Sequence, residues 1–156
     1  MTNRMNISVS PQGDRILNKA IRIDAPASMV WDVLTTPVFM EKWMAETEIH
    51  ILTDWTVGHP IIIHGNLHGI KFKNKGTVLQ FEREQILQYS HLSSLSRLPD
   101  EPRNYSIIEF LLAPIENQTE LTLTLRNFPT EAIYQHLAFY WNVTLEILKK
   151  TVEELG

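Results

Sequence analysis

The chain has 156 residues, a net charge of −4 and a hydrophobic fraction of 44%. This length suits one domain with a buried core, and the few, scattered Lys and Arg residues argue against a nucleic-acid-binding face. The absence of cysteine excludes disulfides and cysteine-based zinc sites. We therefore predict no metal, no cofactor and no nucleic-acid partner.

The N-terminal region divides into a polar leader and the start of the folded domain. Residues 1–13 lack the apolar core of a signal peptide, and no stretch approaches the ~20 apolar residues of a membrane span. We expect a flexible leader over residues 1–13, a single domain over residues 14–156, no membrane span and a cytoplasmic location. Ile16–Ile23 is predicted to be the first strand.

Two short helices are predicted after this strand. Pro26 suits the first turn of a helix, and Val30, Trp31 and Leu34 form an apolar stripe at helical spacing. Pro37 should end this helix. A second helix is predicted at residues 38–43, with Phe39 and Trp43 pointing inward.

Strand-like periodicity dominates the middle of the chain. Leu121, Leu123 and Leu125 alternate with polar residues, which is typical of a strand with one dry and one wet face. Turn signals at residues 57–60, 68–69, 74–76 and 116–117 separate six strand-like runs, at residues 48–55, 60–69, 73–82, 85–92, 105–114 and 119–128. Short turns between consecutive strands predict an antiparallel meander that twists and curls.

The C-terminal region predicts one long amphipathic helix. Thr130 is a plausible N-cap, and no Gly or Pro follows before about Glu154. The expected fold is therefore α+β of the helix-grip type. A curved antiparallel sheet of about six or seven strands wraps around the C-terminal helix, with two short helices after the first strand.

Four segments carry a family resemblance: residues 23–31, residues 39–44, residues 57–60 with 75–79, and residues 141–149. They resemble the START-like, or Bet v 1-like (SRPBCC), superfamily, and more narrowly the Activator of Hsp90 ATPase homologue 1-like family, over roughly residues 16–155. The resemblance implies the helix-grip fold, which hosts ligand carriers, cyclases, hydratases and chaperone regulators. Tyr140 stands where this family usually has glycine, which predicts a smaller or more polar cavity.

The resemblance implies a cavity between the sheet and the first half of the long helix. We expect it to bind a small apolar ligand that is lipid-like, aromatic or polyketide-like. The long loop at residues 93–104 is interpreted as a lid. The predicted ligand-binding walls are Phe39, Trp43, Trp55, Ile63, Phe110, Ile133, His136, Leu137, Tyr140 and Trp141.

Two other classes of function stay open from the sequence. A cyclase or hydratase would need polar cavity residues, for which the candidates are His50, His91, Glu109, His136 and Tyr140, although Glu109 is expected to face solvent. A stress-response or chaperone-regulating module would have Hsp90 as a possible partner, and a homodimer is also open. His64 and His68 lie four strand residues apart, about 13 Å, which argues against a shared metal ion.

Overall fold

The computed structural model describes residues 15–156, so the predicted leader at residues 1–13 lies outside the described residues. Strand β1 (Ile16–Ile23) leads into helices α2 (Ala27–Thr35) and α3 (Pro37–Trp43), and the chain ends in helix α4 (Glu131–Leu155). Between α3 and α4 lie strands β2 (Ile49–Leu52), β3 (Pro60–Leu67), β4 (Ile70–Glu82), β5 (Ile86–Ser93), β6 (Ser106–Ile115) and β7 (Gln118–Arg126). The predicted α+β class and element order are confirmed.

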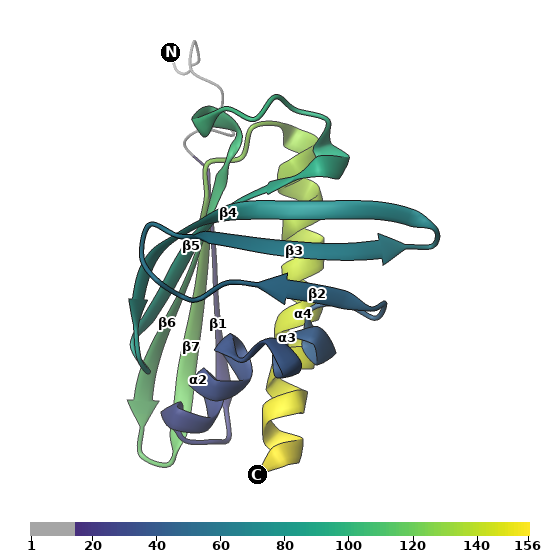
Figure 1. Cartoon of the computed structure of the whole chain (residues 1–156). Helices are drawn as coiled ribbons and strands as arrows, with labels where there is room; N and C mark the ends of the chain where they lie inside the picture. Colours follow the sequence, from purple (N-terminus) through teal and green to yellow (C-terminus); the bar gives the residue numbers. More distant parts are fainter. Residues whose placement is uncertain (1–14) are drawn as a thin grey trace, which may run out of the picture.

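The strands form a seven-stranded antiparallel sheet in the order β1-β7-β6-β5-β4-β3-β2. In Figure 1, β6, β7 and β1 run down the view while β3 and β2 run across it, so the sheet bends strongly between its two edges. Helix α4 lies against the concave side of this bend. The curved sheet and the long helix together are the helix-grip arrangement.

One predicted turn is wrong. Residues 74–76 lie inside β4, whereas the turn predicted at His68 and Gly69 is confirmed and joins β3 to β4, with φ angles of 51° and 90°. Gly76 is needed for a different reason, since a Cβ there would stand 1.7 Å from the backbone oxygen of Ser90. Close approach of two strands therefore accounts for this glycine.

The two short helices close one end of the sheet. Val30, Trp31 and Leu34 of α2 are each at most 1% exposed, as their spacing predicts. The Trp43 indole at the end of α3 donates a 2.8 Å hydrogen bond to the Val33 carbonyl oxygen. This bond ties α3 to α2 within the core.

Helix α4 is buried unevenly along its length. The Thr130 hydroxyl accepts a hydrogen bond from the Ile133 amide, as the predicted N-cap should. The second half packs into the core through Leu145, Leu148 and Val152, each at most 4% exposed. Among residues 15–156, no helix combines the length and apolarity needed to cross a membrane.

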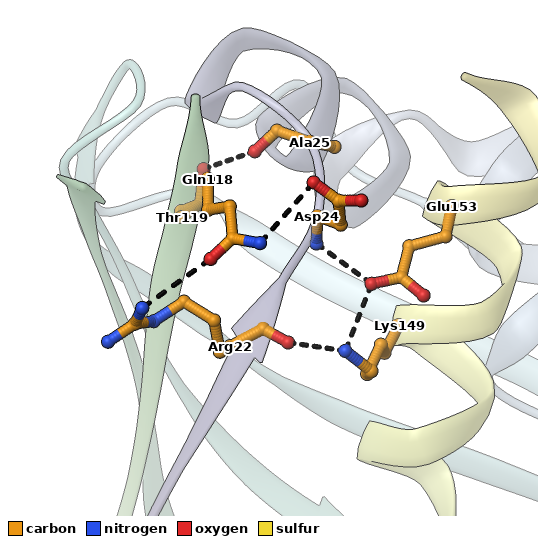
Figure 2. Close-up of polar contacts among 7 residues, drawn as sticks. All are labelled: Arg22, Asp24, Ala25, Gln118, Thr119, Lys149 and Glu153. Carbon is orange, nitrogen blue, oxygen red and sulfur yellow. Dashed lines mark hydrogen bonds and ion pairs between the residues drawn. The ribbon is translucent and has the colours of Figure 1, made fainter. Parts of the chain in front are cut away.

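A polar network fixes the C-terminal end of α4 to the sheet (Figure 2). Lys149 donates to the Arg22 carbonyl oxygen at 2.6 Å and pairs with Glu153 at 2.9 Å. The same Glu153 carboxylate accepts a 2.8 Å bond from the Asp24 amide. These contacts lower the pKa of Glu153, chiefly through the Asp24 amide. The ionised carboxylate therefore joins α4 to the segment that links β1 and α2.

We predict that Glu153→Gln destabilises the fold by about 0.5–1 kcal/mol, because it weakens one ion pair and one charge-assisted hydrogen bond. A lowered folded-state pKa contributes stability above the ordinary value of 4.5 and loses it as the pH falls through the folded value. The difference between wild type and variant should therefore shrink in acid. Urea denaturation across pH measures it. The exposed Glu154→Gln is the matched control, and an equal effect of both variants would contradict the network's role.

Candidate functional site

A cavity of about 680 Å³ lies between the first half of α4, the inner face of the sheet and the loop that follows β5. Its walls are mostly apolar and include Ile49, Ile63, Phe72, Ile108 and Leu137. Cavities of this size and character are typical small-molecule sites. A smaller pocket, of about 220 Å³, lies between β1 and α4.

Helix α4 supplies one continuous wall. Its lining side chains recur at three- and four-residue steps, which places them on one helix face; they are Ala132, Ile133, His136, Leu137, Tyr140 and Trp141. Leu137 and Trp141 are buried, whereas His136 is exposed. The wall therefore runs from solvent at its N-terminal end to the core at Trp141.

Strand β5 supplies the most polar part of the opposite wall. Tyr89 and His91 are two residues apart, so they share the inner face of the sheet. Burial raises the pKa of Tyr89, and the nearby Tyr140 adds to the effect. Burial also lowers the pKa of His91 to about 4, with a further contribution from His136. Both groups are therefore neutral at physiological pH.

Tyr140 joins the helix wall to α3. Its hydroxyl donates a hydrogen bond to the Met44 carbonyl oxygen, and its ring meets the Trp141 indole edge-on at 5.0 Å. Burial raises the pKa of Tyr140 to about 12. The side chain fills space that a glycine would leave empty, and its proton is already used within the protein.

Six of the ten predicted wall residues line the cavity, and four lie elsewhere. Trp43 and Phe110 are buried behind Trp141, with ring centroids 6.3 and 5.5 Å from the indole. Trp55 and Phe39 were also predicted to line the cavity, and neither does. Trp55 stacks on Phe81 at 5.1 Å, and Phe39 lies under the Lys42 ammonium on α3. The six that line the cavity are Ile63, Ile133, His136, Leu137, Tyr140 and Trp141.

Trp55 is held away from the cavity by its own hydrogen bond. Its indole nitrogen donates to the Thr35 carbonyl oxygen at 2.7 Å, and its backbone has a φ of 58°. The ring therefore covers α2 and Phe81 instead of the inner face near Tyr89. The presence of a tryptophan at position 55 does not by itself indicate whether its ring lies on the cavity wall or against α2 and Phe81.

The candidate acid–base residues divide between the cavity and the surface. His91, His136 and Tyr140 line the same cavity. Glu109 lies on the other face of β6, where it accepts a 2.9 Å hydrogen bond from Gln88, and His50 is exposed beside Glu48. Three of the five candidate acid–base side chains therefore line the cavity, and the candidate carboxylate, Glu109, does not.

Tyr89 and Phe72 line the cavity but were not among the predicted wall residues. The period of β5 could have identified Tyr89, because the buried Leu87 two residues earlier marks the inner face. Phe72 had no comparable signal. Its ring lies over Gly65 on β3, where a Cβ would stand 2.3 Å from the ring, a contact that depends on the strand register.

The histidines on the β3–β4 hairpin do not converge. His64 lies within β3 and His68 in the following turn, and both are exposed. Across residues 15–156, no group of three or more His, Cys, Asp or Glu side chains is placed to hold a metal ion.

The loop predicted to be a lid borders the cavity. It contains two short 3-10 helices, η1 (Ser94–Ser96) and η2 (Pro102–Asn104), and contributes Leu95, Leu98 and Asn104 to the cavity wall. Asp100 anchors it by accepting hydrogen bonds from Lys75 on β4 and from the Tyr105 hydroxyl. These two partners, Lys75 first, lower the pKa of Asp100.

We predict that Lys75→Gln increases the rate of trypsin cleavage after Arg97 or Arg103 by about two- to fivefold, because loss of this surface ion pair makes local opening of the loop more frequent. Limited proteolysis followed by mass spectrometry measures the rate. The exposed Lys71→Gln on the same strand is the control. Equal cleavage of wild type and Lys75→Gln would show that the pair does not restrain the loop.

Several solved structures share this architecture. The solution structure of ChR145 from Cytophaga hutchinsonii is 35% identical, with a TM-score of 0.76 and coverage of 90% of this chain and 95% of that one. CV1439 from Chromobacterium violaceum is 21% identical, with a TM-score of 0.77 and coverage of 88% and 96%. DynU16, from the dynemicin biosynthetic locus, is 18% identical with a TM-score of 0.70, and the match covers 90% of this chain and 48% of DynU16. The last two likenesses show the fold alone.

A search of functionally curated proteins gives no match. The family model described as Activator of Hsp90 ATPase homolog 1-like protein matches residues 24–153. That match includes both short helices, the sheet from β2 to β7 and nearly all of α4. The chain belongs to the Activator of Hsp90 ATPase homologue 1-like family.

Proposed function

We propose that this protein binds a small, mainly apolar molecule in the cavity between α4 and the sheet. The observation that carries the proposal is a space of about 680 Å³ whose walls are mostly apolar. Apolar side chains normally pack against one another, so a largely apolar pocket of this size needs an explanation. Membership of a family whose domains commonly bind hydrophobic ligands supports the same reading.

The aromatic side chains around Trp141 favour a ligand with flat or branched apolar groups. Trp141 meets Tyr140 and Phe110 edge-on, at 5.0 and 5.5 Å between ring centroids. These contacts fix the indole, which is only 2% exposed. A ligand at this end of the cavity would meet a rigid aromatic surface, which reduces the entropy cost of binding.

Pyrene is a suitable probe because it is apolar, rigid and fluorescent. We predict that it binds wild type and raises the melting temperature, by roughly 5–10 °C at a hundredfold excess over its dissociation constant. Native mass spectrometry checks the stoichiometry, with one pyrene per chain expected. If no apolar probe bound at any accessible concentration, the proposal would be wrong.

A cavity-filling substitution locates the binding event. We predict that Ile133→Phe on the cavity wall weakens pyrene binding by at least about tenfold, because the larger phenylalanine side chain occupies space that pyrene would fill. Val143→Phe, on the outer side of the same helix and 44% exposed, is the matched control. Fluorescence titration gives both affinities. Equal losses in the two variants would place the binding outside the cavity.

A further inference from the structure

Within residues 15–156 the cavity wall has no permanently charged cation, and the basic side chains on it are the histidines His68, His91 and His136. Within residues 15–156 no Lys or Arg lines it, and the one carboxylate that does, Glu46, is exposed. The half-buried His91 does not replace a cation, since desolvation lowers its pKa to about 4 and keeps the ring neutral. A ligand carboxylate would therefore lose its hydration without gaining an opposite charge, which is a costly exchange.

The N-terminus of α4 does not supply the missing positive charge. Thr130 and Ile133 both line the cavity, but the Thr130 hydroxyl already accepts the Ile133 amide hydrogen. Glu131 places a carboxylate in the first turn, where it complements the helix dipole and pairs with Arg15 at 3.1 Å. The positive end of the helix is thus already compensated.

The same wall holds hydrogen-bonding groups that the protein does not use. Among the described residues, neither the Tyr89 hydroxyl nor the His91 ring has a hydrogen-bond partner. Asn74 Oδ1 and Trp141 Nε1 are also buried without partners, and both residues line the cavity. A neutral imidazole and a phenol can each donate and accept, so they suit an uncharged oxygen.

We propose that the cavity selects uncharged ligands that carry a hydroxyl or carbonyl oxygen on an apolar body, held by Tyr89 and His91, and that it discriminates against carboxylates. The inference rests on the proposed function and specifies its ligand class. It assigns the polar contact to β5, whereas α4 and β3 provide the apolar walls. A free fatty-acid anion of similar size is thereby excluded from the preferred ligands.

Pyrene and three derivatives test the inference at neutral pH by fluorescence titration; the derivatives are pyrenemethanol, the methyl ester of pyrenecarboxylic acid, and pyrenecarboxylate. We expect the alcohol and the ester to bind at least about tenfold more tightly than the carboxylate, because only the carboxylate must bury an unpaired charge. The ester is the neutral control for the size of the acid group. Equal affinities for the carboxylate and the ester would overturn the inference.

Variants assign the contact to named groups. Tyr89→Phe should weaken pyrenemethanol binding by about three- to tenfold, the range expected for one hydrogen bond, and leave pyrene binding unchanged. Tyr134→Phe, whose ring packs on Phe128 outside the cavity, is the matched control. If Tyr89→Phe did not alter the difference between pyrenemethanol and pyrene, the role given to Tyr89 would be wrong.

A gain-of-binding variant tests the missing cation directly. His136→Arg places a guanidinium on the cavity wall, and we expect it to improve pyrenecarboxylate binding by at least about fivefold while pyrenemethanol changes little. Phe139→Arg adds the same charge on a side chain that is 73% exposed and does not line the cavity. Equal gains in both variants would contradict the inference. Failure of pyrene itself to bind wild type would refute the proposed function, and the inference with it.

Discussion

The structure depends on fitting a straight helix against a bent sheet. Helix α4 has 25 residues and is therefore about 38 Å long, whereas the strands change direction between β6 and β3, so that the sheet curves around the helix (Figure 1). The chain packs the second half of α4 through Leu145, Leu148 and Val152, so the unfilled space must appear beside the first half.

The aromatic residues mark the boundary between the packed and the hollow end. Trp141 has Phe110 and Trp43 on its core side and belongs to the cavity wall as well. Its position in the middle of α4 makes it a partition between the two regions. The polar network around Glu153 holds the packed end in place (Figure 2), so the hollow end does not have to supply the domain's cohesion.

The fold was predictable from the sequence because hydrophobic period and capping are local signals. The boundaries of β1, the α2 stripe and the Thr130 cap all follow from residues close together in the chain. The site was only partly predictable. The spacing along α4 puts Ile133, Leu137 and Trp141 on one helix face, which lines the cavity. The positions of Trp55 and Phe110, by contrast, depend on which distant ring each one meets, and that is set by strand register and sheet curvature.

The inner face of β5 shows how the chain changes from core to site. Alternate residues along it are Leu87, Tyr89, His91 and Ser93, so polarity rises as the strand leaves the packed end, and the last three line the cavity. A sequence optimised for stability alone would continue the apolar series, because each buried polar group without a partner costs about 1–3 kcal/mol. Retaining Tyr89 and His91 there exchanges stability for hydrogen-bonding capacity, which the proposed ligand would use.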